Sequence, residues 1–373
     1  MHSGVAGPFS WHFGVRGDAT GTLLTASKID EKTLETAVAG SDGGVCGLMT
    51  AEHKTRRACL AVLGMHRSGT SALTRALNIL GAALPDTMIG ASEGNDTGHW
   101  EPLRLVLLHD EMLEEAGSNW DDWRSLDLSR LTDPRRAWYR SEAARIIRQD
   151  FGADSPIVLK DPRICRFVPF FAEVCAELDM ELKPVLMMRD PREVSASLER
   201  RNRMARPHAL LLCLRHMLDA EKETRGLERA FVDYADLLLD WRRTRDVIVA
   251  RTGVDLADTD SPAGRLVDEF ISPDQRHHNT GRGDLAAADD LGNWIGTVVE
   301  QYGILAATGE NPAALAELDR VGRELDHAIP FLAGIESHYR DQYSVTVDAR
   351  VSRGVRIAKT YLRPFARRRS RVR

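Results

Sequence analysis

The stretch Gly64-Met-His-Arg-Ser-Gly69-Thr70-Ser71 decides the fold class of this chain. It follows the apolar run Cys59–Leu63, which predicts a buried strand, and it leads into Ser71–Leu80, whose leucines share one helical face. A glycine-rich turn between a strand and a helix aims backbone N–H groups and the positive end of the helix dipole at one point. The turn is therefore predicted to bind a phosphate group.

The spacing of this turn is close to that of an ATP-binding P-loop, with one difference. Gly64 and Gly69 are five residues apart and a hydroxyl residue follows, but Thr70 stands where a P-loop carries its lysine. The cation of the turn itself is Arg67. The turn is thus suited to hold a phosphate without a lysine on a γ-phosphate. Residues 64–71 are called the phosphate loop below.

Strand-like and helix-like segments alternate along the core of the chain. Further strands are predicted at 157–160, 183–189 and 230–233. Helices are predicted at 103–116, 133–149, 167–178, 193–202, 207–225, 237–251 and, with Pro312 and Pro330 as interruptions, 294–343; residues 256–293 are predicted to be rich in loops. The alternation predicts an α/β fold, in which a P-loop-like parallel β-sheet is flanked by helices and followed by a helical C-terminal part.

Composition shifts divide the chain into three predicted parts. Residues 1–55 are expected to be a flexible N-terminal extension, 56–345 an α/β domain, and 346–373 a basic tail. The 24 residues from Arg350 to Arg373 contain nine Arg, one Lys and no acid, so the rest of the chain carries −15 against −5 for the whole. The tail is interpreted either as a solvated segment or as a contact with anionic lipid or polysaccharide. The acidic body disfavours nucleic acid as its partner.

The overall composition is that of an ordinary soluble protein of 373 residues. No apolar run approaches the length of a transmembrane helix, and the start of the chain lacks a basic-then-apolar signal pattern. The five cysteines form no CxxC pair, which indicates neither a disulfide framework nor a zinc site. These features predict a cytoplasmic protein, with the tail as a candidate contact to the inner membrane face.

Polar residues collect at three predicted strand ends, namely the phosphate loop, Lys160–Arg163 and Arg189–Ser197. In an open α/β sheet, ligands bind at the carboxyl ends of the strands. The three segments are therefore expected to converge on one ligand, although they lie far apart in the sequence.

Two of these segments resemble the sulfotransferase family, which uses 3′-phosphoadenosine 5′-phosphosulfate (PAPS) as donor. The family's donor loop has a basic residue, Ser-Gly-Thr and a further Thr or Ser, and this chain has Arg67-Ser68-Gly69-Thr70-Ser71. The family also has an Arg at a strand end and a Ser eight residues later, which match Arg189 and Ser197. The family also often has a strand that leads into Tyr-x-Asp-Leu, and Tyr234–Leu237 of this chain is similar to that motif. The resemblance covers roughly half of the chain.

The resemblance implies that PAPS is bound by Arg67, Ser68, Gly69, Thr70, Ser71, Arg189 and Ser197. Backbone N–H groups of the phosphate loop and the Thr70 and Ser71 hydroxyls would hold the 5′-phosphate. Arg67 would neutralise that phosphate and the leaving oxygen, and Arg189 would grip the 3′-phosphate with Ser197. Sulfuryl transfer needs no divalent metal to bridge two phosphates, so no metal site is expected.

The catalytic base is the open part of this interpretation. Lys160 aligns with the lysine of a Lys-Thr-His sequence in one branch of the family and is expected near the donor, but Pro162 stands in place of the histidine. A carboxylate or imidazole near the acceptor hydroxyl could take its proton, and Glu93, His99 and Glu101 are the candidates. The resemblance implies Glu101 first, because bacterial members often have Gly-x-aromatic-Glu in this place; His99 is second and Glu93 third. Asp161 and Arg163 could orient substrate, brace the loop or form a structural turn. Tyr234 is given no site role.

The predicted function is sulfuryl transfer from PAPS to a hydroxyl acceptor, which is expected to be a carbohydrate or glycolipid. Two alternatives stay open. A P-loop-like nucleotide kinase would need a magnesium site and a lysine at the position of Thr70. A non-catalytic nucleotide- or glycan-binding protein would keep the same fold without a base.

Overall fold

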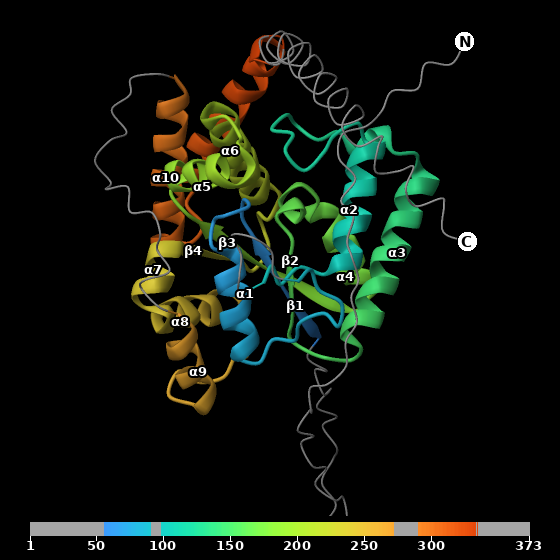
Figure 1. Ribbon diagram of the computed structural model, residues 1–373, viewed down its shortest axis with the longest axis vertical. Coiled ribbons are helices and arrows are strands. Elements are labelled where there is room, and N and C mark those ends of the chain that lie inside the picture. The colour runs from blue at the N-terminus through green and yellow to red at the C-terminus, as the bar shows by residue number, and fades with distance from the viewer. Residues whose placement is uncertain (1–55, 91–97, 272–289, 333, 335–373) are drawn as a thin grey trace, which may run out of the picture. The chain divides into compact units, whose positions relative to one another are not determined.

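The computed structural model describes residues 56–90, 98–271, 290–332 and 334 (Figure 1). Internal contacts divide the chain into two units, Met1–His53 and Lys54–Arg373, and the described residues all belong to the second. The predicted N-terminal extension 1–55 and basic tail 346–373 lie outside the described residues.

The sheet of the second unit has four parallel strands in the order β2-β1-β3-β4. Their bounds are Arg57–Leu63 for β1, Ile157–Lys160 for β2, Met180–Met188 for β3 and Ala230–Asp233 for β4. From β1 the chain continues to β2 on one side of β1 and then to β3 on the other, so β1 lies where the winding direction reverses. The predicted parallel α/β architecture is confirmed, and the phosphate loop follows the strand at which ligands of such sheets bind.

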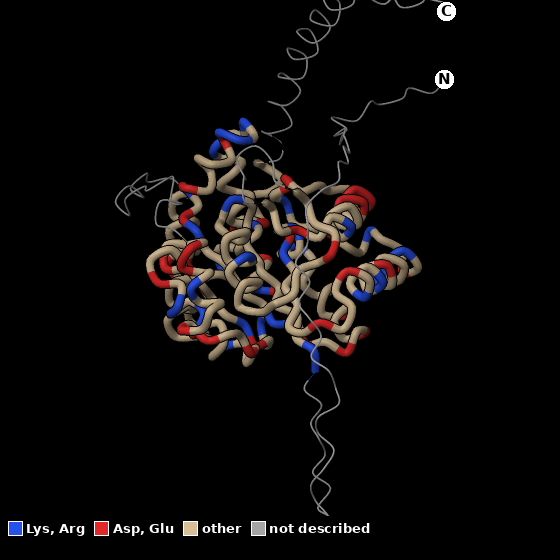
Figure 2. The backbone as a smooth tube through the Cα atoms, turned by 60° about the horizontal axis from the view of Figure 1, so that its bottom comes forward, with Lys and Arg blue, Asp and Glu red and all other residues tan. Residues whose placement is uncertain are grey.

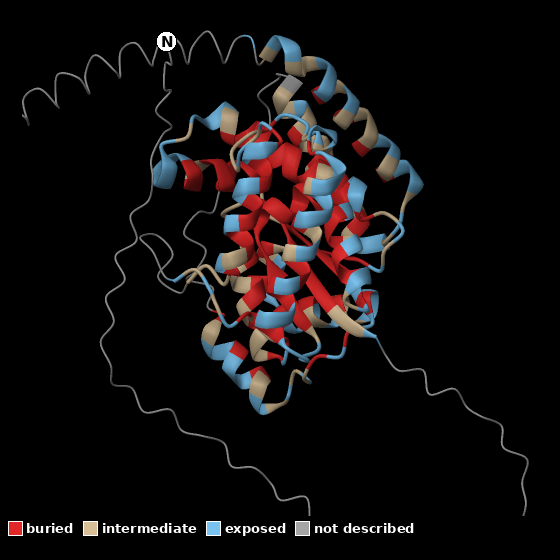
Figure 3. Ribbon diagram, turned by 90° about the vertical axis from the view of Figure 1, so that its right-hand side faces the viewer, coloured by how far each residue is buried: buried red, intermediate tan, exposed pale blue. Residues whose placement is uncertain are grey.

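Helices cover both faces of the sheet (Figures 1 and 3). The first face packs against α2 (Leu103–Glu115), α3 (Asp133–Phe151), α4 (Val168–Glu177), α5 (Pro191–Asn202), α6 (Arg206–Glu223) and α10 (Asp290–Thr308). The second packs against α1 (Thr70–Ile79), α7 (Tyr234–Leu239), α8 (Trp241–Thr252) and α9 (Pro262–Phe270). Cys59, Ala61 and Leu63 of β1 face the first core, and Leu60 and Val62 face the second. This burial on both faces explains why the strand is a continuous apolar run.

Three sequence predictions about helices are corrected by the structure. The helix predicted at 237–251 is two helices, α7 and α8, separated at Asp240, whose carboxylate caps α8 by accepting from the Arg243 N–H. The predicted loop 256–293 contains α9, which begins with a Ser261 cap and a proline in the first turn. The helix at 312–332 continues past Pro330, which does not interrupt it.

Acidic and basic residues are interspersed over the helices of the described residues (Figure 2). Arg135 of α3, for example, pairs with Glu111 and Glu115 of α2. Two short 3-10 helices, η1 (Leu128–Arg130) and η2 (Pro162–Arg166), complete the elements. Cys59, Cys165, Cys175 and Cys213 are free and buried. Among the described residues, no helix has the length and apolar character needed to cross a membrane.

Candidate active site

The phosphate loop is held in a tight turn between β1 and α1. Gly69 directly precedes α1 with φ 93°, and Arg67 also has a left-handed backbone at φ 70°. The backbone N–H and the hydroxyl of Ser68 both donate to the Met65 carbonyl oxygen, at 3.1 and 2.6 Å. The Ser68 hydroxyl therefore stabilises the turn itself. The groups that the loop can offer to a ligand are then mainly its backbone N–H groups.

Tyr234, at the start of α7, packs against the phosphate loop and against Arg189. A Cβ atom added to Gly69 would overlap the Tyr234 ring. The Arg189 guanidinium carbon lies 4.6 Å from the centre of the same ring, which is a cation–π contact. Tyr234 has no predicted site role, whereas the structure places its ring against Gly69 and Arg189, which belong to the two predicted phosphate-binding segments. Its place in the Tyr-x-Asp-Leu motif was the signal that could have found it.

The two segments predicted to bind phosphates are in direct contact. The Arg67 Nε–H donates to the Ser197 hydroxyl at 2.9 Å, across 130 residues of sequence. The Arg189 side chain donates to the Arg67 carbonyl oxygen at 3.1 Å and to Glu193 at 2.9 Å. The carboxyl ends of β1 and β3 thus bring Arg67, Arg189 and Ser197 to one place, as the order of the strands requires.

Lys160, at the end of β2, contacts the phosphate loop at Ser71. Its ammonium lies 2.6 Å from a Glu101 carboxylate oxygen, and the two side chains are only 2% and 7% exposed. The same ammonium donates to the Ser71 hydroxyl at 3.2 Å, and this hydroxyl donates to the His99 carbonyl oxygen at 3.2 Å. The predicted residues Lys160, Ser71, His99 and Glu101 are therefore neighbours, and Glu93 lies outside the described residues.

The two candidate bases differ in their protonation chemistry. Burial raises the pKa of the Glu101 carboxyl, and the Lys160 ammonium opposes this without cancelling it. Burial lowers the pKa of His99 to about 4, and the positive charges of Lys160 and Arg201 add to the shift. His99 is consequently neutral at neutral pH, while the pKa of the Glu101 carboxyl lies above its usual value.

Asp161 and Arg163, which closely follow β2, connect the end of this strand to α2. Asp161 is fully buried, accepts from the backbone N–H and the guanidinium of Arg163 at 3.1 and 2.9 Å, and contacts His109 Nδ1 at 2.6 Å. Arg163 also donates to Asp110 at 2.7 Å. Burial favours protonation of Asp161, but Arg163 and His109 outweigh it and hold its pKa well below the usual range. Since His109 and Asp110 belong to α2, these contacts fix the helix that follows Glu101.

Trp100, between the two candidate bases, adopts a left-handed backbone at φ 55°. Such a conformation is costly for an aromatic residue and concentrates at functional sites. The guanidinium of Arg75 on α1 lies 4.9 Å from the centre of the indole ring. This contact helps to retain the backbone turn that separates His99 from Glu101.

A second indole, Trp120, packs edge-on against His66 of the phosphate loop, with ring centres 5.2 Å apart. The segment that follows Trp120 is held by its backbone, because the carbonyl oxygens of residues 121–124 all accept side-chain hydrogen bonds. The donors are His208, Arg166 and Arg215. The wall that Trp120 provides beside the phosphate loop is therefore held in place before any ligand arrives.

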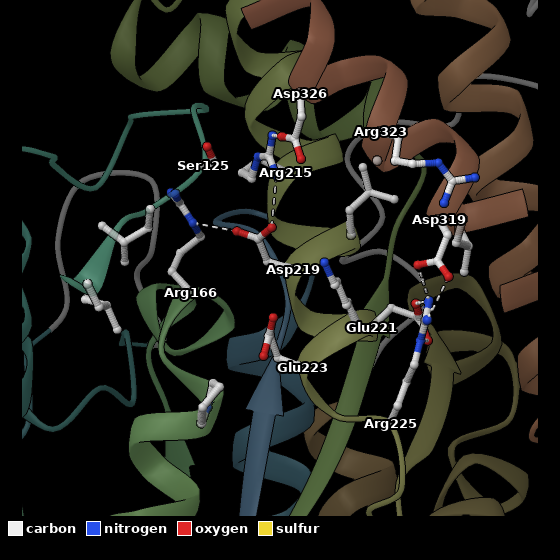
Figure 4. Close-up of a pocket in the computed structure, with 17 residues that line it drawn as sticks. Ser125, Arg166, Arg215, Asp219, Glu221, Glu223, Arg225, Asp319, Arg323 and Asp326 are labelled. Atoms are coloured by element: carbon white, nitrogen blue, oxygen red, sulfur yellow. Dashed lines mark hydrogen bonds and ion pairs between the residues drawn. The ribbon is translucent and has the colours of Figure 1, made fainter. Parts of the chain in front are cut away.

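A cavity of about 620 Å³ lies between η2, the end of α6 and the helix at 312–332 (Figure 4). Several of its charged side chains pair with each other: Asp219 with Arg166 and Arg215, and Arg225 with Asp319. None of the residues predicted to bind donor or acceptor lines this cavity. The predicted site and the cavity are separate features.

Comparisons with known proteins give matches among solved structures alone. No protein-family model matches the chain, and no curated protein matches it. The sulfotransferase domain of the Synechococcus PCC 7002 olefin synthase is similar with a TM-score of 0.36 and 17% identity, over 73% of this chain and 96% of that domain. The sulfotransferase domain of the curacin biosynthetic pathway has a TM-score of 0.36 and 15% identity, over 72% and 97%. Both are domains of the family that the motifs of this chain resemble.

Proposed function

We propose that this protein transfers a sulfuryl group from PAPS to a hydroxyl acceptor. The observation that carries the proposal is the direct contact between the two phosphate-binding segments, through Arg67, Ser197 and Arg189. One donor molecule with a phosphate at each end of its ribose needs two anion sites a few ångströms apart. A glycine-rich turn with Arg67 provides one, and the Arg189–Ser197 pair at the next strand end provides the other.

The reaction would proceed by positioning and charge neutralisation. The acceptor oxygen forms a bond to the donor sulfur while the bond from sulfur to the bridging phosphate oxygen breaks, and the electron pair stays on that oxygen. Arg67 and Lys160 stabilise the charge that develops on the leaving group. Glu101 takes the proton of the acceptor hydroxyl, and 3′,5′-adenosine bisphosphate leaves as the second product.

The ion pair with Lys160 gives Glu101 a defined orientation before substrate binds. Once the donor is bound, its negative charge offers the Lys160 ammonium a second partner, next to the Ser71 hydroxyl that it already contacts. Glu101 would then share its cation with the donor and become a stronger hydrogen-bond acceptor for the incoming hydroxyl. Donor binding and activation of the base are thus coupled through one lysine.

The acceptor class that we propose is a carbohydrate or glycolipid. Its support is the resemblance of the sequence to bacterial sulfotransferases and the basic segment 346–373. The sulfuryl transfer itself requires no metal ion. A screen of hydroxyl acceptors with radiolabelled PAPS tests both the reaction and the acceptor class.

Saturating 3′,5′-adenosine bisphosphate is expected to raise the thermal unfolding temperature, whereas ATP with magnesium is not. A ligand that binds only the native state stabilises it by about 2.7 kcal/mol at 100 times its Kd. The comparison of 3′,5′-adenosine bisphosphate with 5′-AMP isolates the 3′-phosphate. In Arg189→Ala the two ligands should give equal shifts, because the cation that distinguishes them is gone.

The absence of any shift with the bisphosphate would overturn the proposed function. A preference for the bisphosphate that survives in Arg189→Ala would overturn only the assignment of the Arg189–Ser197 pair. Arg203→Ala serves as the control, since Arg203 is an exposed arginine that follows the last residue of α5.

Glu101→Gln is expected to lower the rate constant of sulfuryl transfer by about 10²–10⁴, the range of general-base contributions. The bisphosphate-induced shift should persist, because the amide removes the base and leaves the phosphate sites in place. Single-turnover transfer of labelled sulfate measures the effect. An unchanged rate would clear Glu101 and move the role to His99, which the variant His99→Gln then tests.

A further inference from the structure

The cavity between η2, the end of α6 and the helix at 312–332 takes no part in the proposed sulfuryl transfer. None of the residues proposed to bind PAPS or to act on the acceptor lines it. Its volume of about 620 Å³ falls within the range of pockets that enclose small organic ligands. Pockets of this size are few in any one protein, and they are the usual places where small molecules bind. The cavity is therefore large enough to hold a ligand of its own.

Ion pairs between the surrounding elements fix the walls of this cavity (Figure 4). Asp219 of α6 pairs with Arg166 of η2 at 2.8 Å, and Arg215 of α6 pairs with Asp326 of the helix at 312–332. The side chains of Arg166 and Arg215 also donate to the backbone carbonyl oxygens of residues 122–124. The cavity is thus formed before a ligand binds, so that binding does not have to order its walls.

One end of the cavity carries an excess of positive charge. Arg225 pairs there with Asp319 at 3.0 Å. This hydrogen bond lowers the pKa of the Asp319 carboxyl, and the nearby charges of Lys222 and Arg323 lower it further. Lys222 and Arg323 are exposed, and neither forms an ion pair with any residue that the structure describes. The Glu223 carboxylate, which also lines the cavity, lies away from Arg323 (Figure 4). An ammonium and a guanidinium without acids of their own favour an anionic ligand group at this end.

The cavity also offers apolar surface to a ligand. Leucine side chains from three parts of the chain line it, namely Leu126 and Leu128, Leu218 of α6, and Leu318 of the helix at 312–332. Leu218 and Leu318 are buried among the neighbouring helices, whereas Leu126 and Leu128 are half-buried. An apolar ligand segment that packs against these leucines is removed from water, which favours its binding.

We propose that this cavity is a second ligand site, which binds a small organic anion with an apolar body. The anionic group lies at Lys222 and Arg323, and the apolar body packs against the leucines. The proposal does not depend on sulfuryl transfer, because none of the lining residues belongs to the phosphate loop or to Arg189–Ser197.

The compounds 4-phenylbutanoate and 4-phenylbutan-1-ol test this assignment, because they share a phenyl ring and a carbon chain and differ in the carboxylate. Their dissociation constants are measured by ligand-observed NMR titrations of the full chain. The native protein should bind the carboxylate about tenfold more tightly than the alcohol, the effect of one hydrogen bond to a charged group. Arg323→Gln and Lys222→Gln should each reduce this preference. Arg320→Gln should retain it, since Arg320 lies on the same helix and does not line the cavity.

Gly322→Leu should abolish binding of both compounds, because the new side chain would occupy the cavity that Gly322 lines. A Cβ added to Gly322 would meet no atom within 4 Å, and leucine is a better helix former than glycine, so the variant should fold. Gly303→Leu is the matched control. Gly303 is a glycine of α10 whose added Cβ would also meet no atom within 4 Å, and it does not line the cavity. Thermal unfolding checks both variants, and the glutamine variants decide the test if Gly322→Leu does not fold.

Binding of neither compound, or equal affinity of the native protein for both, would overturn the proposal. So would a folded Gly322→Leu variant that binds the carboxylate as the native protein does. Displacement of the carboxylate by 3′,5′-adenosine bisphosphate would also overturn it, since the carboxylate would then occupy the phosphate loop. The proposed sulfuryl transfer fails in a different way: if the bisphosphate gives no thermal shift, the donor assignment is wrong whatever the two phenyl compounds do.

Discussion

Lys160→Met is expected to destabilise the protein by about 3–5 kcal/mol, the usual cost of removing one partner of a buried ion pair. Lys160 and Glu101 are both almost completely buried and lie 2.6 Å apart, so the variant leaves an uncompensated carboxylate in a dry environment. Sulfuryl transfer should be lost as well, because the leaving-group cation is gone. Urea denaturation measures the first effect and single-turnover transfer the second.

The double variant Lys160→Met/Glu101→Met separates stability from function. A buried ion pair replaced by apolar side chains of similar volume is often neutral or stabilising, so the double variant should recover most of the lost stability. Activity should not return. Lys183→Met is the matched control, since the Lys183 partners Glu181 and Glu228 are 45% and 68% exposed and can be hydrated after the change.

The Lys183→Met variant is expected to lose less than about 1 kcal/mol of the free energy of unfolding, the range measured for exposed ion pairs. A Lys160→Met variant as stable as Lys183→Met would show that the Glu101 carboxylate finds another partner or takes up a proton at little cost. The coupling between donor binding and the base through Lys160 would then have to be abandoned.

Gly69→Ala is expected to abolish the thermal shift with 3′,5′-adenosine bisphosphate. At φ 93° the alanine backbone is strained by about 1–3 kcal/mol, and its Cβ would overlap the Tyr234 ring. Relief requires movement of the ring or of the loop. Movement of the ring would disturb the surface on which Arg189 stacks, and movement of the loop would disturb the first turn of α1. Both phosphate sites are therefore affected by one methyl group.

Gly81→Ala provides the control for backbone strain alone. Gly81 has φ 112°, and a Cβ there would meet no atom within 4 Å. This variant should lose stability and keep the ligand-induced shift. In Gly69→Ala/Tyr234→Ala the overlap is removed, so stability should partly recover while the preference for a 3′-phosphate stays weak. A Gly69→Ala protein that binds the bisphosphate normally would contradict the role given to this turn.

Local sequence patterns were sufficient for the strands and for most helices. The apolar run before Gly64 predicts β1, and the Lys160 end of β2 was located to the residue. The misses were local as well: Ser261-Pro262 is a helix start within a polar segment, and Asp240 divides one apolar period into two helices. In both cases a capping side chain sets where the helix begins, and the spacing of apolar residues alone does not predict such a capping position.

The candidate site was predictable as a list of residues and not as a set of contacts. Arg67, Arg189 and Ser197 could be named from their motifs, and their convergence followed from the strand-end rule. The engagement of Ser68 within its own loop and the packing of Tyr234 between Gly69 and Arg189 were not visible in the sequence. The first depends on the backbone conformation of the loop, and the second on which side of the loop the tertiary fold brings the Tyr234 ring to.

The sequence by itself determined the parallel α/β class, the glycine-rich turn after β1 and the absence of the P-loop lysine, because each depends on residues that are neighbours in the chain. Only the tertiary structure decided that Lys160 is paired with Glu101 and that Arg67 donates to the Ser197 hydroxyl. The reason is physical. The period of a strand or helix is set by local backbone geometry, whereas the strand order β2-β1-β3-β4 is set by burial of apolar faces contributed by the whole domain.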